Sequence, residues 1–205
     1  MSNRYLDEFF RLRCAGDVLS ACAPVNNGSK EISEAMGARH ALLDMIITEQ
    51  KCKYHVLDLC AGNGLFGLLV AHTLPVSSVC AIDKRYREFH LDNVKRYRYI
   101  FADIYDCELH MNEPTIVCGV HVCRDLAAHI VRIYLNNENA KKLVLMPCCV
   151  GSFTPPTNHH LILERVPKAL QWVWYLADMA RGCIKQDMHI LSPRNYIITA
   201  EKRDG

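Results

Sequence analysis

Short apolar runs alternate with amphipathic stretches along most of the chain, beginning near His55. Such alternation is typical of βαβ units, and therefore of a parallel sheet. The apolar runs predict seven strands: Tyr54 to Leu59, Ser78 to Ile82, Tyr99 to Phe101, Thr115 to Gly119, Lys142 to Met146, His189 to Leu191 and Tyr196 to Lys202. The stretches between them predict four helices: Gly64 to Thr73, Tyr86 to Tyr97, Cys123 to Leu135 and Val166 to Ile184. We therefore expect a doubly wound α/β fold with a mostly parallel, seven-stranded sheet.

The first 50 residues have a different pattern, which predicts helices without strands. Tyr5 to Arg13 mixes apolar and charged residues, and Ile32 to Gln50 is rich in residues that favour helices. A turn-forming segment from Ala23 to Ser29 separates the two. We interpret residues 1–50 as a helical cover for one side of a sheet formed by residues 51–205, within one structural domain.

Composition and charge limit the classes of partner. The chain has 205 residues, half of them apolar, which suffices for one sizeable core. Its formal net charge of +2 gives no overall field that would favour nucleic acids or membranes, so any basic surface has to be local. No run approaches the ~20 apolar residues of a membrane span, and the N-terminus carries charges where a secretory signal would be apolar. These features predict a cytoplasmic protein without a membrane partner.

The sequence contains eleven cysteines, an odd number, many of them inside apolar runs. This is the pattern of free thiols rather than of a disulfide framework. No Cys-x-x-Cys pair occurs, and the adjacent Cys148 and Cys149 would point to opposite faces of a strand, which is poor geometry for binding one zinc ion. We therefore predict no metal site; the alternative cluster would consist of His121, Cys123, Cys148 and Cys149.

The strongest chemical signal is a buried strand that leads through a glycine turn into a helix, from Val56 to Gly67. Gly62 and Gly64 let the backbone approach a ligand closely, and the start of the following helix presents unpaired amide donors. With Gly67 they form Gly-x-Gly-x-x-Gly, a pattern that a dinucleotide-binding turn shares.

Three carboxylates accompany this turn at the ends of successive predicted strands. Asp58 lies in the first apolar strand, where a carboxylate needs a partner to offset its desolvation, and a cationic ligand would provide one. Asp83 ends the second strand, where this fold places an acid against ribose hydroxyls, and Asp103 ends the third. An NAD-binding domain would also explain the glycines and Asp83, but it leaves Asp58 and Asp103 without a function.

In order and spacing, these segments resemble the first three motifs of class I S-adenosylmethionine (SAM) dependent methyltransferases. The resemblance implies SAM as the cofactor, with the glycine turn beside its methionine part, Asp83 on its ribose and Asp103 with Ile104 at its adenine. Cys60 stands where the family more often has its first glycine. The residues assigned to cofactor binding are Asp58, Cys60, Ala61, Gly62, Asn63, Gly64, Asp83, Lys84, Asp103, Ile104 and Gly119.

A narrower resemblance concerns two later segments, from Gly119 to Ala127 and from Leu143 to Cys149. They look like the His-x-Cys-Gly-Asp-Leu and Cys-Cys segments of the branch that includes the eukaryotic acceptor-stem tRNA 2′-O-methyltransferases and related methyltransferase-like proteins. This sequence departs from that branch at Arg124, where glycine is usual, and after Cys149, where Val-Gly-Ser-Phe follows. The resemblance implies a methyltransferase, and the departures leave its acceptor open.

Methyl transfer from a sulfonium requires an oriented acceptor and, where needed, a base. His121 and Asp125 are candidate bases that we expect one turn apart at the start of a helix, although Asp125 would equally serve as a helix cap. Arg124 is a candidate for binding phosphate or a carboxylate, the alternative being an exposed arginine. A nucleophilic role for Cys148 or Cys149 is disfavoured, because cysteines are more often buried for packing.

Two basic clusters with interleaved tyrosines, Lys84–Arg87 and Lys95–Tyr99, flank one predicted helix. Positive charge beside aromatic rings suits phosphates and stacked bases, so RNA, including tRNA, is the acceptor we favour. The alternatives are a protein or small-molecule methyltransferase, and a catalytically silent SAM-fold subunit that binds a partner.

Overall fold

A computed structural model of the chain describes residues 3–49, 54–91, 94–153 and 165–202. Its centre is a seven-stranded sheet in the order β3-β2-β1-β4-β5-β7-β6. Of these strands, β7 alone runs in the direction opposite to the others. The predicted doubly wound, mostly parallel sheet is therefore confirmed. The strands are β1 His55–Leu59, β2 Ser78–Asp83, β3 Tyr97–Phe101, β4 Thr115–Cys123, β5 Ala140–Cys149, β6 Cys183–Gln186 and β7 Tyr196–Glu201.

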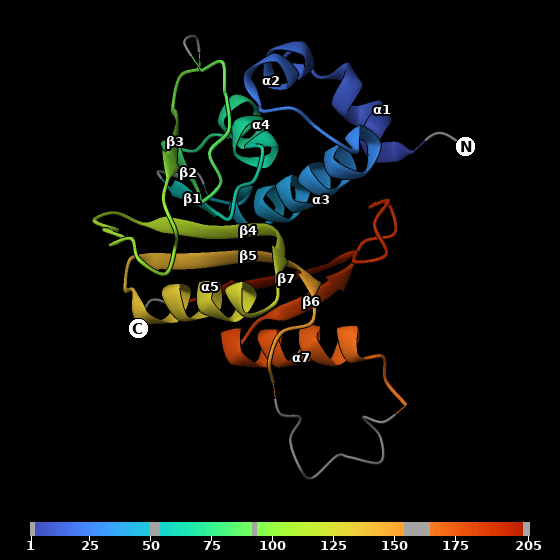
Figure 1. Cartoon of the computed structure of the whole chain (residues 1–205), viewed down its shortest axis with the longest axis vertical. Coiled ribbons are helices and arrows are strands. Elements are labelled where there is room, and N and C mark those ends of the chain that lie inside the picture. Colours follow the sequence, from blue (N-terminus) through green and yellow to red (C-terminus); the bar gives the residue numbers. More distant parts are fainter. Residues whose placement is uncertain (1–2, 50–53, 92–93, 154–164, 203–205) are drawn as a thin grey trace.

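Helices cover both faces of this sheet (Figure 1). The first four lie on one face and the last two on the other, and two apolar core clusters fill the layers on either side of the strands. The long α3 packs directly against α4 and against the central strands. The helices are α1 Arg4–Arg11, α2 Ala15–Ala21, α3 Gly28–Ile46, α4 Leu65–Thr73, α5 Asp125–Asn136 and α7 Lys168–Ala180.

The strand order places a ligand crevice at the end of β1. This strand pairs in parallel with β2 on one side and with β4 on the other, so the connections from β1 and β4 leave toward opposite faces. In open α/β sheets, ligands bind outside the carboxyl ends of the strands at such a reversal of strand order. The glycine turn after β1 lies at this point.

The helix predicted over Tyr86 to Tyr97 is wrong. The described residues of this segment form no helix, and Tyr97 already belongs to β3, opposite Val79 of β2. Contacts with distant residues decide its conformation: the Phe89 ring stacks at 4.2 Å on Tyr99, and the backbone amide of His90 donates to a carbonyl of α2. Tertiary packing here overrides a local helical pattern.

The seventh strand also lies elsewhere than predicted. The helix ends at Ala180 because Arg181 adopts a left-handed conformation with φ 52°, and the next amide bonds back into the helix, leaving room for β6. The predicted strand His189 to Leu191 is a turn, in which the His189 amide donates to the Asp187 carboxylate at 3.0 Å. The short strand before it pairs with β7 instead.

None of the helices in the described part of the chain combines the length and the apolar character that crossing a bilayer requires.

Candidate functional site

The connection from β1 to α4 is a tight turn built on left-handed backbone. Cys60, Gly62 and Gly64 have φ values of 60°, 59° and 78°, and the Gly64 amide donates to the Ala61 carbonyl at 2.9 Å. Left-handed φ favours glycine, which explains why glycine is the commoner residue at the position of Cys60. Burial raises the pKa of the Cys60 thiol to about 12, helped by nearby carboxylates, so the thiol stays protonated near neutral pH.

Asp58 is a buried carboxyl group with little hydrogen bonding. Asp58 is 1 % exposed, and neither of its carboxylate oxygens has a hydrogen-bond partner of ordinary geometry among the described residues. Burial raises its pKa to about 8; the Gly67 amide opposes this rise, and the negative charge of Asp83 adds to it. Asp58 borders a cavity of about 260 Å³ together with the glycine turn and residues of α3. An unpartnered carboxyl beside a cavity is the arrangement expected where a cation binds.

Asp83 ends β2 directly across the turn. Its carboxylate accepts the Gly62 amide at 2.9 Å and the backbone amide of Arg85 at 2.9 Å, and the Arg85 guanidinium pairs with it at 3.1 Å. Burial acts to raise its pKa, but the hydrogen bonds from Arg85 and Gly62 outweigh burial and hold the pKa below its ordinary value. The carboxylate is thus ionised, with Arg85 in the place where the fold would put a ribose.

Asp103 lies one strand further, at the end of β3. It accepts the Tyr105 amide at 3.1 Å and pairs with Lys84 at 3.3 Å, and these contacts lower its pKa, the Tyr105 hydrogen bond most strongly. Ile104 is buried, and its carbonyl accepts a hydrogen bond from His129 at 3.2 Å. The three predicted acids therefore follow β1, β2 and β3 in turn along one edge of the sheet.

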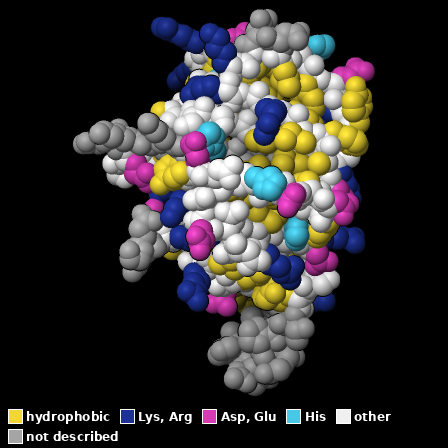
Figure 2. All heavy atoms as spheres, turned by 90° about the vertical axis from the view of Figure 1, so that its left-hand side faces the viewer, with side chains coloured by type: hydrophobic (Ala, Val, Ile, Leu, Met, Phe, Trp, Pro, Cys, Tyr) yellow, Lys and Arg dark blue, Asp and Glu magenta, His cyan; other side chains and the backbone are white. Residues whose placement is uncertain are grey.

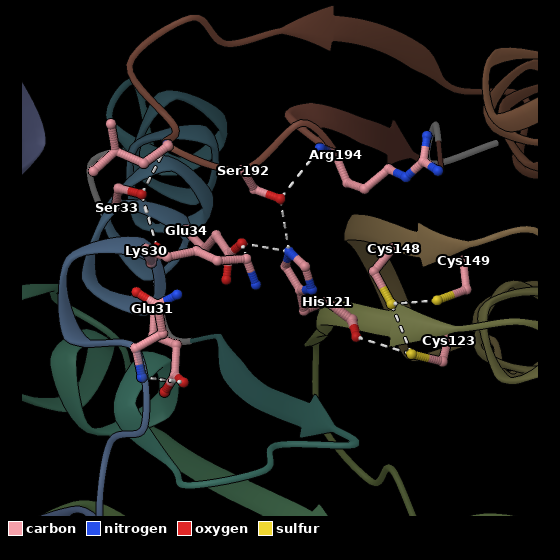
Figure 3. Close-up of polar contacts among 12 residues, drawn as sticks. Lys30, Glu31, Ser33, Glu34, His121, Cys123, Cys148, Cys149, Ser192 and Arg194 are labelled. Carbon is pink, nitrogen blue, oxygen red and sulfur yellow. Dashed lines mark hydrogen bonds and ion pairs between the residues drawn. The ribbon is translucent and has the colours of Figure 1, made fainter. Parts of the chain in front are cut away.

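Figure 3 shows a second group of polar residues on this edge, which comes from three distant segments. Glu34 of α3 is 3 % exposed; its carboxylate lies 2.5 Å from Nε2 of His121 and 3.1 Å from Nζ of Lys30. Ser192, from the loop between β6 and β7, approaches the same histidine nitrogen at 3.4 Å. Glu34 therefore fixes the orientation of the His121 ring at the wall of the cavity.

A bulge in β4 aims His121 at this wall. The residue has φ 60°, and the pairing with β5 skips it, passing from Val120 to Val122. Bulges next to active sites commonly redirect one side chain out of the strand's alternation. Strained, left-handed backbone at a non-glycine residue is also concentrated at functional sites.

The other two predicted catalytic residues are not brought together with His121. The expectation that His121 and Asp125 lie one turn apart in a helix is wrong, because His121 belongs to β4 and α5 begins at Asp125. Asp125 accepts hydrogen bonds from the Ser152 amide at 2.6 Å and hydroxyl at 3.2 Å, so it anchors the segment after β5. Arg124 is exposed with φ 52°, in a backbone conformation that favours glycine. After β5 the structure describes the chain as far as Phe153, and residues 154–164 lie outside the described residues.

Two residues assigned to the cofactor have structural contacts of their own. Asn63 donates to Glu31 of α3 at 2.6 Å and accepts the Leu65 amide at 3.1 Å, which ties the glycine turn to the helical cover. Gly119 does not line the cavity: a Cβ there would lie 2.8 Å from Ile130 of α5 and 2.7 Å from Val122. Its lack of a side chain lets α5 pack closely on β4.

The two basic clusters are largely engaged within the molecule. Lys84 and Arg85 pair with carboxylates, and Arg96 donates to backbone carbonyls at the end of α4 and just after it. Tyr97 is buried, and the Tyr99 hydroxyl donates to the glycine turn at 3.0 Å. On the face seen in Figure 2, which is the left-hand side of Figure 1, basic and acidic side chains are interspersed. Several residues of the two basic clusters therefore make contacts that stabilise the fold.

A larger cavity, of about 430 Å³, lies under residues 107–113 against the other side of β1 and β2. It contains none of the predicted cofactor or catalytic residues. We therefore place the site at the smaller cavity, where the unpartnered acid, the glycine turn and His121 converge.

Sequence reasoning missed Glu34 and Ser192 as site residues, and it assigned Arg85 to RNA rather than to Asp83. Glu34 had a signal, because a carboxylate among the apolar residues of a predicted helix needs a partner. Ser192 had none, since its contact with His121 joins segments 71 residues apart.

No protein-family model matches this sequence, and no curated protein does either. Among solved structures, magnesium protoporphyrin IX methyltransferase from Synechocystis PCC 6803 with bound SAH aligns with 98 % of this chain and 95 % of its own, at a TM-score of 0.53 and 13 % identity. A putative O-methyltransferase from Nostoc punctiforme PCC 73102 aligns with 84 % of this chain and 57 % of its own, at a TM-score of 0.50 and 14 % identity. This chain therefore has the Rossmann-like fold found in SAM-dependent methyltransferases.

Proposed function

We propose that the protein is a SAM-dependent methyltransferase. The observation that carries the proposal is the buried Asp58 carboxyl, which has no hydrogen-bond partner of ordinary geometry among the described residues and borders a cavity at the glycine turn. Asp83 accepts the Gly62 amide of the same turn. A cationic ligand that also carries ribose hydroxyls satisfies both acids at once. A nicotinamide dinucleotide would use Asp83 but would leave Asp58 unexplained.

The residues present fit SAM. Asp58 offsets positive charge on the ligand, Gly62 admits it close to the backbone, and Asp83 accepts hydrogen bonds from its ribose after Arg85 moves aside. Asp103 with Ile104 follows the next strand, and the resemblance implies that they contact the adenine, although neither lines the cavity. The Arg85 side chain is 61 % exposed and can therefore swing into solvent, and the ribose hydroxyls replace the hydrogen bonds that Asp83 gives up.

When bound, SAM supplies a methyl group on a positively charged sulfur. The chain holds the acceptor in line with that methyl group and removes a proton where the acceptor carries one. With Nε2 of His121 committed to Glu34, its Nδ1 is the nitrogen left to take the proton, and it makes no hydrogen bond in the part of the chain described. Glu34 then stabilises the protonated imidazole, as a carboxylate does in other histidine pairs.

Calorimetric titration with SAM and with its demethylated product tests the proposal. We expect wild type to bind both, and Asp83→Ala to lose affinity about 100-fold or more, because each hydrogen bond to a charged group contributes roughly 1.5–3 kcal/mol. Asp178→Ala, an exposed acid on α7, is the matched control and keeps wild-type affinity. If wild type binds neither ligand, the cofactor assignment is refuted for this chain.

For the acceptor, we propose RNA. Tyr86 and Phe101, 77 % and 61 % exposed, form an edge-to-face pair at 6.2 Å close to Asp83 and Lys84. Exposed rings at the ligand edge of the sheet offer stacking surfaces for unpaired bases, and the exposed Lys95 and Arg98 add positive charge at the opposite, amino end of β3.

Replacing either ring by alanine is expected to weaken binding of a labelled single-stranded RNA by about 1–3 kcal/mol at fixed salt, measured by fluorescence anisotropy. Trp174→Ala, which removes an exposed ring of α7, controls for general loss of aromatic surface. A transfer assay with radiolabelled SAM and bulk tRNA completes the test. Label that enters only protein or small molecules would reject RNA, and SAM binding without any transfer would instead indicate a silent subunit.

A further inference from the structure

Three cysteine thiols meet at the ends of β4 and β5, beside the proposed active site (Figure 3). The sulfurs of Cys123 and Cys148 are 2.7 Å apart, those of Cys148 and Cys149 are 3.4 Å apart, and all three lie within 4.8 Å of one another. Cys123 and Cys149 are exposed and Cys148 is half-buried. This convergence is the only such group of three or more possible metal ligands among the residues that the structure describes.

The expectation that Cys148 and Cys149 point to opposite faces is wrong, and a bulge explains why. The pairing of β4 with β5 runs from Val122 opposite Pro147 directly to Cys123 opposite Cys149, so Cys148 is the extra residue. An extra residue breaks the alternation of side chains along a strand. Both sulfurs therefore turn toward Cys123.

The spacing suits one thiophilic metal ion. Sulfurs bound to a tetrahedral zinc ion at about 2.3 Å lie roughly 3.8 Å from one another, and the three sulfurs of this cluster, all within 4.8 Å of one another, reach that arrangement by small side-chain movements. All three cysteines are free thiols. Rotation of exposed side chains is enough to open the closest contact.

The surroundings leave one coordination position open. Since two of the cysteines are exposed, solvent reaches the cluster on the side away from the core. Three protein ligands with an open fourth position are typical of zinc sites that take part in chemistry, whereas closed sites with four ligands are structural.

We propose that Cys123, Cys148 and Cys149 bind one Zn²⁺ ion through three thiolates, with a water molecule or a donor atom of a bound molecule in the fourth position. On binding, each thiol gives its proton to solvent, and three zinc–sulfur bonds form without any change of oxidation state. The site does not depend on the cofactor assignment, because none of the three sulfurs belongs to the SAM cavity.

Cobalt titration of the reduced, metal-free full-length protein tests this proposal. We expect one Co²⁺ per chain, with thiolate-to-cobalt charge-transfer absorption and the visible bands of a tetrahedral site, and displacement by one equivalent of Zn²⁺. Cys123→Ser, Cys148→Ser and Cys149→Ser should each lose the charge-transfer absorption or reduce it sharply. Cys183→Ser, which removes an exposed cysteine of β6, should leave it unchanged.

A second measurement needs no variant. Bound Zn²⁺ should protect these three cysteines, and not Cys183, from alkylation of the wild-type protein, as mapped by mass spectrometry of peptides. The proposal is overturned if the reduced chain binds no cobalt at this stoichiometry, if zinc gives no protection, or if folded Cys148→Ser keeps the full absorption. A Cys123–Cys148 disulfide that persists with zinc and excess reduced thiol would overturn it equally.

Discussion

Asp58→Asn is expected to make the ligand-free protein more stable and, at the same time, to remove most of its affinity for SAM. The carboxyl is buried without a hydrogen-bond partner among the described residues, so its charged form is strongly disfavoured in the folded state. Asparagine has nearly the same shape and no charge. The negative charge of Asp58 destabilises the ligand-free fold, and the same charge attracts a cationic ligand.

The stabilisation should depend on pH in a defined direction. The folded-state pKa of Asp58 is about 8, against about 3.9 in an unfolded chain, so the folded state holds the proton more tightly between these values. The wild type therefore loses stability as the pH rises through this window, and the asparagine variant does not. We expect the variant to gain about 5–6 kcal/mol above pH 8 but only about 1–2 kcal/mol near pH 5.

Urea unfolding at pH 5, 7 and 8.5 measures this difference, with Asp178→Asn as the exposed control. Calorimetry should show SAM affinity falling at least about 100-fold in Asp58→Asn, because a buried ligand charge loses its partner. In wild type, binding below pH 8 has to expel the Asp58 proton, so affinity should rise with pH up to that point. A pH-independent stabilisation, or unchanged SAM binding, would contradict this role of Asp58.

The parts of the site that could be predicted from sequence are those encoded locally. Asp58, the glycine turn and Asp83 lie within 26 consecutive residues of one β-α-β unit, in which strand, turn and acid follow from the order of residues alone. The turn's left-handed positions require glycine or strain, which makes them visible in a sequence. The fold class follows from the same alternation of strands and helices.

The parts that could not be predicted depend on contacts between distant segments. The segment around Phe89 has a helical pattern, but its contacts with Tyr99 and α2 keep its described residues out of a helix. The bulges that aim His121 at Glu34 and turn Cys148 beside Cys149 have no marker in the sequence, since strand pairing decides them. The expectation that side chains alternate along a strand therefore fails at these bulges, which hold residues of the proposed sites.

Within the turn itself, structure separates two glycines that look alike in sequence. A Cβ on Gly64 would lie 2.5 Å from the Tyr97 hydroxyl oxygen and 2.9 Å from the Phe89 ring, whereas a Cβ on Gly62 would meet only Arg85, at 3.6 Å. Both have left-handed φ, so alanine costs strain at either position. Steric overlap is added at Gly64 alone.

We therefore expect Gly64→Ala to destabilise the protein by about 3 kcal/mol, from strain of roughly 1–2 kcal/mol plus overpacking of a similar size. Gly62→Ala should cost only about 1 kcal/mol. Thermal unfolding should then show a Tm lower by about 6–12 °C for the first variant and about 2–4 °C for the second. Equal losses for the two variants would mean that strain, and not the Tyr97 contact, sets the cost.

Tyr97→Phe tests the cause directly, because it removes the hydroxyl that a Gly64 Cβ would meet first. That hydroxyl is buried without a hydrogen-bond partner among the described residues, so its loss alone should be nearly neutral. In the Gly64→Ala background it should restore about 1 kcal/mol, while the contact with Phe89 remains. The glycine turn is thus fixed by tight packing under it as much as by the ligand proposed above it, and a side chain at Gly64 would disturb both.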